Sequence, residues 1–113
     1  MELLAELAKI MNELEIPFET AVYTREPPDE YVILCPIVDT YDLHADNRPG
    51  VAIQEVQISI FTKGSYKQLK TKILAVLLDR EIIITERRFN GYDEKTGYYH
   101  YSIDVANYYS LEV

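Results

Sequence analysis

The chain has 113 residues, a net charge of −8 at pH 7, 48% apolar residues and 27% charged residues. These values are typical of one globular domain over residues 1–113 and exclude a disordered chain. No apolar run approaches the roughly 18–20 residues that span a bilayer, so we expect a soluble protein with no membrane partner. The negative charge argues against a surface that grips nucleic acid by displacing counterions.

The charge is distributed unevenly along the chain. Residues 1–62 contain 12 acidic and 3 basic residues, a net charge of −9, whereas residues 63–113 contain 7 acidic and 8 basic residues, a net charge of +1. We therefore expect one acidic side. Such a side is either a solvated face, half of a contact between neighbouring copies, or a wall that DNA does not adhere to.

The first half of the chain predicts a helix and then strands. Apolar residues recur at helical spacing from Leu3 to Leu14, and Pro17 ends the pattern. PFETAVYT, residues 17–24, predicts a first strand before a proline-containing turn. YVILCPIVDTY, residues 31–41, predicts a second, central strand, in which Pro36 requires an edge, a bulge or a break. We favour a bulge or a break there.

The middle of the chain continues with a loop, a strand and a helix. YDLHADNRPG, residues 41–50, predicts a polar loop that ends in a turn. Apolar and polar residues alternate from Glu55 to Ile60, which predicts a strand with one buried face, while its other face meets water or a partner. Ser65 is a candidate N-cap for a helix whose apolar stripe runs from Tyr66 to Leu77.

Two further strands follow, EIIITERRF and GYYHYSIDVANYYSL, joined by the hairpin connection NGYDEKTG at residues 90–97. Gly91 and Gly97 are expected to supply positive φ. The order is αβββαββ. We therefore predict the α+β class, with a mainly antiparallel sheet of four or five strands and two helices packed on one face.

The residues do not predict a catalytic site. His44 and His100 have neither zinc-site nor triad spacing, and Cys35, the only cysteine, is expected to be a buried structural thiol. We therefore predict no enzyme, no cofactor and no metal.

Two arrangements that include acidic residues offer alternatives to that prediction. Asp42, His44 and Asp46 alternate and would bind a cation if the backbone were extended, but such alternation is common in surface loops. Glu55 and Asp104 on adjacent strands would resemble a glycosidase pair, but glycosidases are usually much larger. We favour ordinary structural roles for both sets.

Tyrosine is unusually frequent, with ten residues and no tryptophan, and five of the ten lie between Tyr98 and Tyr109. Tyrosine packs well in strands, which is the interpretation we favour, but it is also enriched at binding surfaces. Because Tyr98 and Tyr99 are adjacent, one of them is expected to point away from the core.

Two motifs together resemble a known family. Q-x-x-I-F-T-K-G-S-Y-K-Q-L, from Gln57 to Leu69, precedes a helix and a hairpin that reads Y-D-E-K-T-G-Y-Y-H, from Tyr92 to His100. This succession is similar to that of the small tail terminator, or tail-to-head joining, proteins of long-tailed bacteriophages and prophages. The resemblance runs from about Tyr31 to Asp104. The first helix and the TREPPDE turn carry no signature of that family.

The resemblance implies a non-enzymatic α+β subunit that assembles as a ring, commonly of six copies, on the head-proximal end of the tail tube. There it would end tube growth and join the tail to the head. The implied partners are further copies of this chain, the tail-tube protein and the head connector protein, with phage DNA passing through without specific binding. The implied location is the head-tail junction of the virion, and the bacterial cytoplasm during assembly.

Polar loops are where rigid scaffolds usually place their contacts, so we expect protein contacts in the loop at residues 41–49 and at the hairpin tip at residues 90–97. The alternative, that both are plain surface turns, stays open. The expected contact residues are Tyr41, Asp42, His44, Asp46, Arg48, Asn90, Tyr92, Asp93, Glu94, Lys95 and Tyr98.

Two other functions remain open. One is a neighbouring neck role, as a head-closure or adaptor protein. The other is a small regulatory module that binds a ligand between sheet and helix, which predicts a discrete pocket and stabilisation by a metabolite.

Overall fold

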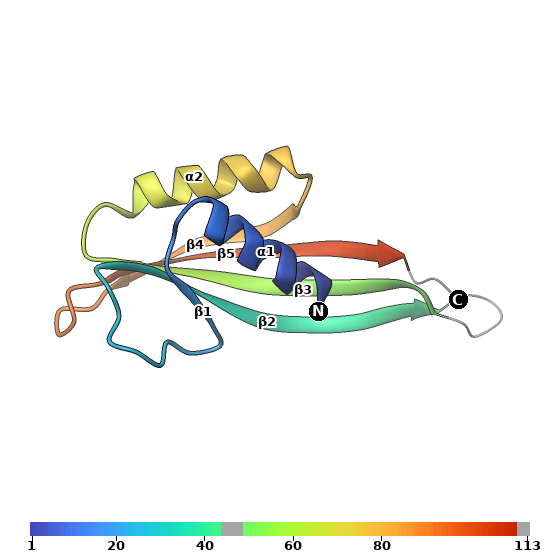
Figure 1. Ribbon diagram of the computed structural model, residues 1–113, viewed down its shortest axis with the longest axis horizontal. Coiled ribbons are helices and arrows are strands. Elements are labelled where there is room, and N and C mark those ends of the chain that lie inside the picture. Colours follow the sequence, from blue (N-terminus) through green and yellow to red (C-terminus); the bar gives the residue numbers. More distant parts are fainter. Residues whose placement is uncertain (44–48, 111–113) are drawn as a thin grey trace.

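The computed structural model describes residues 1–43 and 49–110 of the chain. Its elements follow the order αβββαββ, as predicted from the sequence. They are α1 (Glu2–Glu13), β1 (Phe18–Thr20), β2 (Glu30–Leu43), β3 (Pro49–Thr62), α2 (Tyr66–Asp79), β4 (Ile83–Tyr92) and β5 (Tyr99–Ser110). Figure 1 shows α1 and α2 on the same side of a long twisted sheet.

The five strands form one mixed sheet in the order β1-β2-β3-β5-β4. β1 pairs with β2 in parallel, and the other three pairings are antiparallel. The mainly antiparallel sheet with both helices on one face is therefore confirmed. The fully buried apolar residues of β3, Val56, Ile58 and Ile60, lie at the centre of the core.

The core lies between the two helices and one face of the sheet. α1 contributes four buried residues, Leu3, Leu7, Ile10 and Met11, and α2 contributes Leu69, Ile73 and Leu77. These residues recur every three or four positions, which places each set on one helical face. Ser65 accepts a hydrogen bond from the backbone N–H of Lys67, so it caps α2 as predicted.

β2 contains the bulge that Pro36 required. The register between β2 and β3 shifts between Pro36 and Val38. Upstream, Val32 donates its N–H to Pro17 and Leu34 accepts from Ala21, so these residues direct their backbone groups outward, away from β3. By alternation Pro36 faces the same outer side, beyond the end of β1, where a strand partner for its missing N–H is not needed.

Several boundaries differ from the sequence predictions. β1 covers residues 18–20 rather than 17–24, because only three of its residues pair with β2. The predicted polar loop at residues 41–50 is shorter, since β2 continues to Leu43 and β3 begins at Pro49. Cross-strand pairing as far as Leu43 and Pro49 outweighs the polar composition of these residues.

The hairpin between β4 and β5 has the glycine conformations that were predicted. Gly91 has φ of 116° and Gly97 has φ of 80°. However, β4 extends to Tyr92, so Asn90 and Tyr92 lie in a strand and not in the hairpin tip. A register shift between Phe89 and Gly91 absorbs one residue and lets the strand continue.

Candidate functional site

The predicted contact residues lie at two opposite ends of an elongated molecule. The principal extents of the chain are 54 × 26 × 22 Å. Leu43 pairs with Pro49 at one end of the sheet, and Tyr99 pairs with Thr62 and with Tyr92 at the other. In Figure 1 the β4–β5 turn lies at the left end of the molecule, whereas the end of β2 and the start of β3 lie at the right end. The two predicted contact regions therefore do not form one surface.

At the β2–β3 end the structure describes only the backbone of two predicted contact residues. Tyr41 and Asp42 lie in β2, paired with Ala52 and Val51. Their side chains lie outside what is described, and His44, Asp46 and Arg48 lie outside the described residues altogether.

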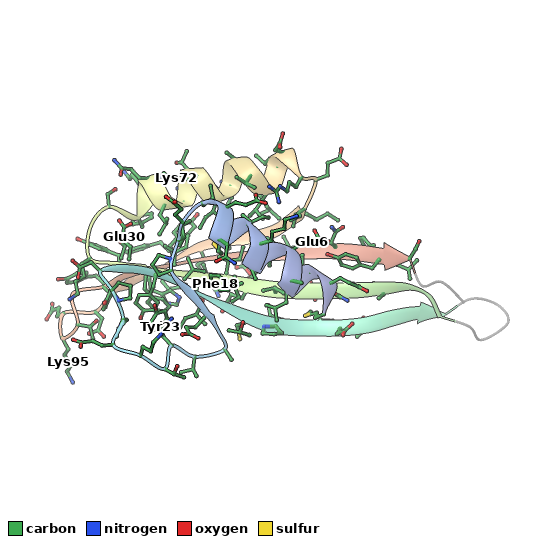
Figure 2. All side chains as sticks on the ribbon, in the orientation of Figure 1. Glu6, Phe18, Tyr23, Glu30, Lys72 and Lys95 are labelled. Carbon is green, nitrogen blue, oxygen red and sulfur yellow. The ribbon has the colours of Figure 1, made fainter. Side chains whose placement is uncertain are left out.

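At the other end, the β4–β5 turn is held by its own hydrogen bonds. The backbone N–H of Asp93 donates to Tyr98, and that of Gly97 donates to Asp93. The Asp93 carboxylate accepts a further bond from the N–H of Lys95 at 2.9 Å. Glu94 and Lys95 are exposed at the tip, and Figure 2 shows Lys95 at the extreme of this end.

Tyr98 attaches this turn to the loop between β1 and β2. Its hydroxyl donates to the carbonyl oxygen of Pro28 at 2.7 Å. Its ring lies edge-on to Tyr31 at 5.3 Å, while Tyr99 contacts Tyr92 at 4.6 Å. Tyr99 pairs with the buried Thr62 of the helix-covered face, so these adjacent tyrosines do point to opposite faces.

Sequence reasoning missed the aromatic cluster that surrounds Tyr98. The rings of Tyr31 and Phe61 stack at 4.9 Å, and those of Phe61 and His100 at 4.4 Å, across β2, β3 and β5. Tyr23 adds a tilted contact with Tyr31 at 4.8 Å. The members come from four separate segments, so no local pattern joins them. We call Tyr23, Tyr31, Phe61, Tyr98 and His100 the aromatic cluster.

His100 is polar and is placed among apolar rings. Burial lowers its pKa, and the positive charge of Arg88 lowers the pKa further. Its Nε2 atom is buried and has no hydrogen-bond partner among the described residues. At neutral pH the imidazole is therefore uncharged, which suits a ring stacked on Phe61.

This pKa predicts a stability loss in mild acid. The unfolded chain binds a proton at His100 near the ordinary pKa of about 6.5, whereas the folded chain binds it only at lower pH. The free energy of unfolding should therefore fall as the pH decreases below about 6.5. Urea titrations at several pH values should show a smaller fall for His100→Asn than for the wild type. Equal falls would contradict this role of His100.

A cleft of about 450 Å³ opens beside the aromatic cluster. Its lining includes Tyr31 and His100 from the cluster, together with Asn90 and Asp93 from the β4–β5 hairpin. Tyr31, Phe61 and His100 face away from the helices, because the residues next to them, Val32, Ile60 and Tyr101, lie in the core. The cleft is therefore not between sheet and helix, where a ligand module was expected to hold its pocket.

Among the described residues, no helix packs on the sheet face opposite α1 and α2. We call this the open face. Its residues alternate with the core residues along β2, β3 and β5, and they are partly polar, as in Gln57 and Asp104. Members away from the aromatic cluster include Ile33, Cys35, Val38, Ile53, Glu55, Gln57, Ser59, Ser102, Asp104, Ala106 and Tyr108.

Cys35 corrects one sequence prediction. It was expected to be buried, but it is only half-buried, and it faces the open side because its neighbour Leu34 fills the core. An uninterrupted apolar run does not tell which residues lie on a covered face when a sheet is covered on one side only.

The described residues do not assemble a metal centre. No group of three or more His, Cys, Asp or Glu side chains among them has the geometry to hold a metal ion. Asp104 pairs with Gln57, so it lies diagonal to Glu55 on the open face and not directly opposite it. In the described part of the chain, no helix is long and apolar enough to cross a membrane.

Comparison with protein families found no matching family model, and comparison with curated proteins found no significant match.

Proposed function

We propose that this chain is a structural phage or prophage protein that caps the head-proximal end of the tail tube as a ring. In this role it ends the growth of the tube and joins the tail to the head. It acts with further copies of itself, with the tail-tube protein and with the head connector protein, while phage DNA passes through the ring.

The main support is the separation of the two predicted contact regions along the 54 Å axis of the molecule. A protein between a tube and a connector needs two contact surfaces that face in opposite directions. One end carries the exposed turn with Glu94 and Lys95, and at the other end β2 and β3 meet at Leu43 and Pro49. The motifs of Gln57–Leu69 and Tyr92–His100 add the resemblance to tail terminators.

The proposed mechanism is geometric. A sheet with two edges recruits further strands unless these edges are blocked or used up by ring closure. In a closed ring each copy satisfies the edges of its neighbours, so addition of subunits stops at a fixed number. The acidic first half of the chain would give the ring a surface to which DNA does not adhere.

A regulatory ligand-binding module is a second candidate, because the cleft beside the aromatic cluster measures about 450 Å³. That volume is within the usual range of small-molecule sites. A thermal-shift screen of metabolites would support this alternative if one compound raised the melting temperature of the wild type but not that of Tyr98→Ala.

The proposal can be tested first by sequencing the DNA that flanks the gene for this chain. A tail-tube gene downstream and portal or connector genes upstream would support a neck protein of a long-tailed phage. Flanking genes of metabolism or regulation would contradict the proposal and favour the ligand-binding module.

A further inference from the structure

The two outer strands of the sheet carry opposite charges in the same cross-strand row. Glu19 of β1 pairs with Ile33, Ile33 with Ser59, Ser59 with Ser102, and Ser102 with Arg88 of β4. A single row thus crosses all five strands. It begins with a carboxylate at one edge and ends with a guanidinium at the other, and both residues belong to the open face.

The rows on either side also end in residues that are compatible as cross-strand neighbours, although these residues do not carry opposite charges. Phe18 and Phe89 are the two ends of the row through Val32, Ile60 and Tyr101. Phe18 is half-buried, and Phe89 is 49% exposed. Thr20 and Arg87 are the ends of the next row, through Leu34, Ile58 and Ile103. One edge therefore reads Phe-Glu-Thr where the other reads Phe-Arg-Arg.

The strand directions and lengths also match. β1 runs antiparallel to β4, because β1 is parallel to β2 and three antiparallel pairings lie between β2 and β4. β1 has three residues, Phe18–Thr20. The segment from Arg87 to Phe89 lies between two register shifts of β4, one after Ile84 and one after Phe89. Each edge thus offers a short regular stretch bounded by irregular backbone.

The backbone groups at these edges alternate between facing the sheet and facing outward. The bonds from Val32 to Pro17 and from Ala21 to Leu34 place the backbone groups of Glu19 toward β2. By alternation, Phe18 and Thr20 direct their N–H and C=O groups outward. The Thr20 carbonyl oxygen already accepts a hydrogen bond from the N–H of Val22 at 2.8 Å, and a carbonyl oxygen has a second lone pair for another donor. The same alternation, followed through the pairings of β3 and β5, directs Arg88 toward β5 and leaves Arg87 and Phe89 facing outward.

We propose that β1 of one copy pairs antiparallel with residues 87–89 of β4 in the next copy. Phe18 then lies opposite Phe89, Glu19 opposite Arg88, and Thr20 opposite Arg87. The sheet continues from copy to copy with every helix on the same side. This inference rests on the proposed ring, because it names the contact through which adjacent subunits of that ring meet.

The occupant of each edge is a second copy of this chain because the two edges complement each other and not themselves. A two-fold contact would bring β1 to β1 or β4 to β4, and the latter would place Arg87 and Arg88 against a second arginine pair. Unlike edges give a head-to-tail contact, which closes into a ring when the rotation per copy allows it. Strand addition of this kind is a common mode of recognition at sheet edges.

Each charge already has a partner within its own chain. Glu19 bonds to Arg25 at 3.1 Å, and Arg88 lies 3.4 Å from Glu86. The side chains of Arg25, Glu86 and Arg88 are all at least half exposed, so these pairs hold their geometry weakly. Replacing these intrachain partners by the opposite charge in the strand of the neighbouring copy therefore costs little free energy.

The test reverses the charges separately and together in the full chain. At low salt and protein concentrations up to about 1 mM, sedimentation equilibrium should show self-association of the wild type. Glu19→Arg alone and Arg88→Glu alone should each associate about a hundredfold more weakly, because like charges then face each other. An equimolar mixture of these two variants, and the double variant that carries both, should regain association.

Two controls separate the edge contact from general effects. Lys72→Glu makes the same change of charge as Arg88→Glu on α2, where Figure 2 shows Lys72 on the helix and not on the sheet, and it should associate like the wild type. Circular dichroism of each variant should match the wild type. A wild type that stays monomeric up to 1 mM, or a mixture of folded variants that does not regain association, would overturn the proposal.

The same variants distinguish this inference from the proposed function. If the edges pair as described but phage that lack the gene make normal virions, the tail function is wrong and the edge contact stands. If those phage fail to join tails, and both single variants restore virions as well as the wild type does, the tail function stands and the edge contact is wrong.

Discussion

Ile58→Ala is expected to lower the free energy of unfolding by about 2–5 kcal/mol. Ile58 is fully buried in β3, next to β2 and β5, and belongs to the core that both helices cover. Removing its three outer carbon atoms leaves a cavity that rigid strands on both sides cannot fill. Urea titration should show a lower midpoint with an unchanged m value.

Ile53→Ala is the matched control for this substitution. Ile53 lies in the same strand but on the open face and is only half-buried. We expect it to cost less than half as much as Ile58→Ala. An equal loss for the two variants would contradict the assignment of the helices to one face of the sheet.

Gln54→Ala is expected to cost about 1–3 kcal/mol, although glutamine is rarely part of a core. Gln54 is 4% exposed, and its side-chain oxygen accepts a hydrogen bond from the N–H of Leu3 at 2.8 Å. Its amide nitrogen donates to Glu2 at 3.1 Å. The first N–H groups of a helix lack partners within the helix, so Gln54 fixes the N-terminus of α1 to the sheet.

Gln57→Ala is the matched control for Gln54→Ala, because Gln57 lies in the same strand but on the open face. A change within about 0.5 kcal/mol is expected there. Hydrogen exchange should also show faster exchange of the amides of α1 in Gln54→Ala but not in Gln57→Ala. Unchanged protection of α1 in both variants would contradict the anchoring role of Gln54.

The sequence predicted the elements better than their limits. Apolar spacing revealed α1 and α2, and alternation from Glu55 to Ile60 revealed β3, because each has one covered face. The same reasoning placed Cys35 in the core, since a continuous apolar run hides which residues face the helices. The polar residues after Tyr41 concealed the extension of β2 and β3, which depends on pairing between the two strands.

The candidate site was less predictable, because most of it depends on which strands lie next to one another. The turn residues Asp93, Glu94 and Lys95 were predicted from local glycine and polar signals, and they do form the turn. The aromatic cluster and the row from Glu19 to Arg88 depend on the strand order β1-β2-β3-β5-β4. That order joins residues far apart in the chain, and no single-sequence period encodes it.

The sheet edges relate the fold to the proposed assembly. β1 pairs with β2 through only three residues, and β4 is interrupted by two register shifts. Short or irregular edges limit unspecific pairing with other strands. In the proposed ring, the short regular stretch left on each edge would select one partner in one register.

The most direct test of the tail-terminator proposal is electron microscopy of a lysate from a phage that lacks this gene. The proposal predicts tails of uncontrolled length and heads without tails, and it predicts normal virions when the wild-type chain is supplied in trans. Tails of normal length, joined to heads without this chain, would contradict the proposal.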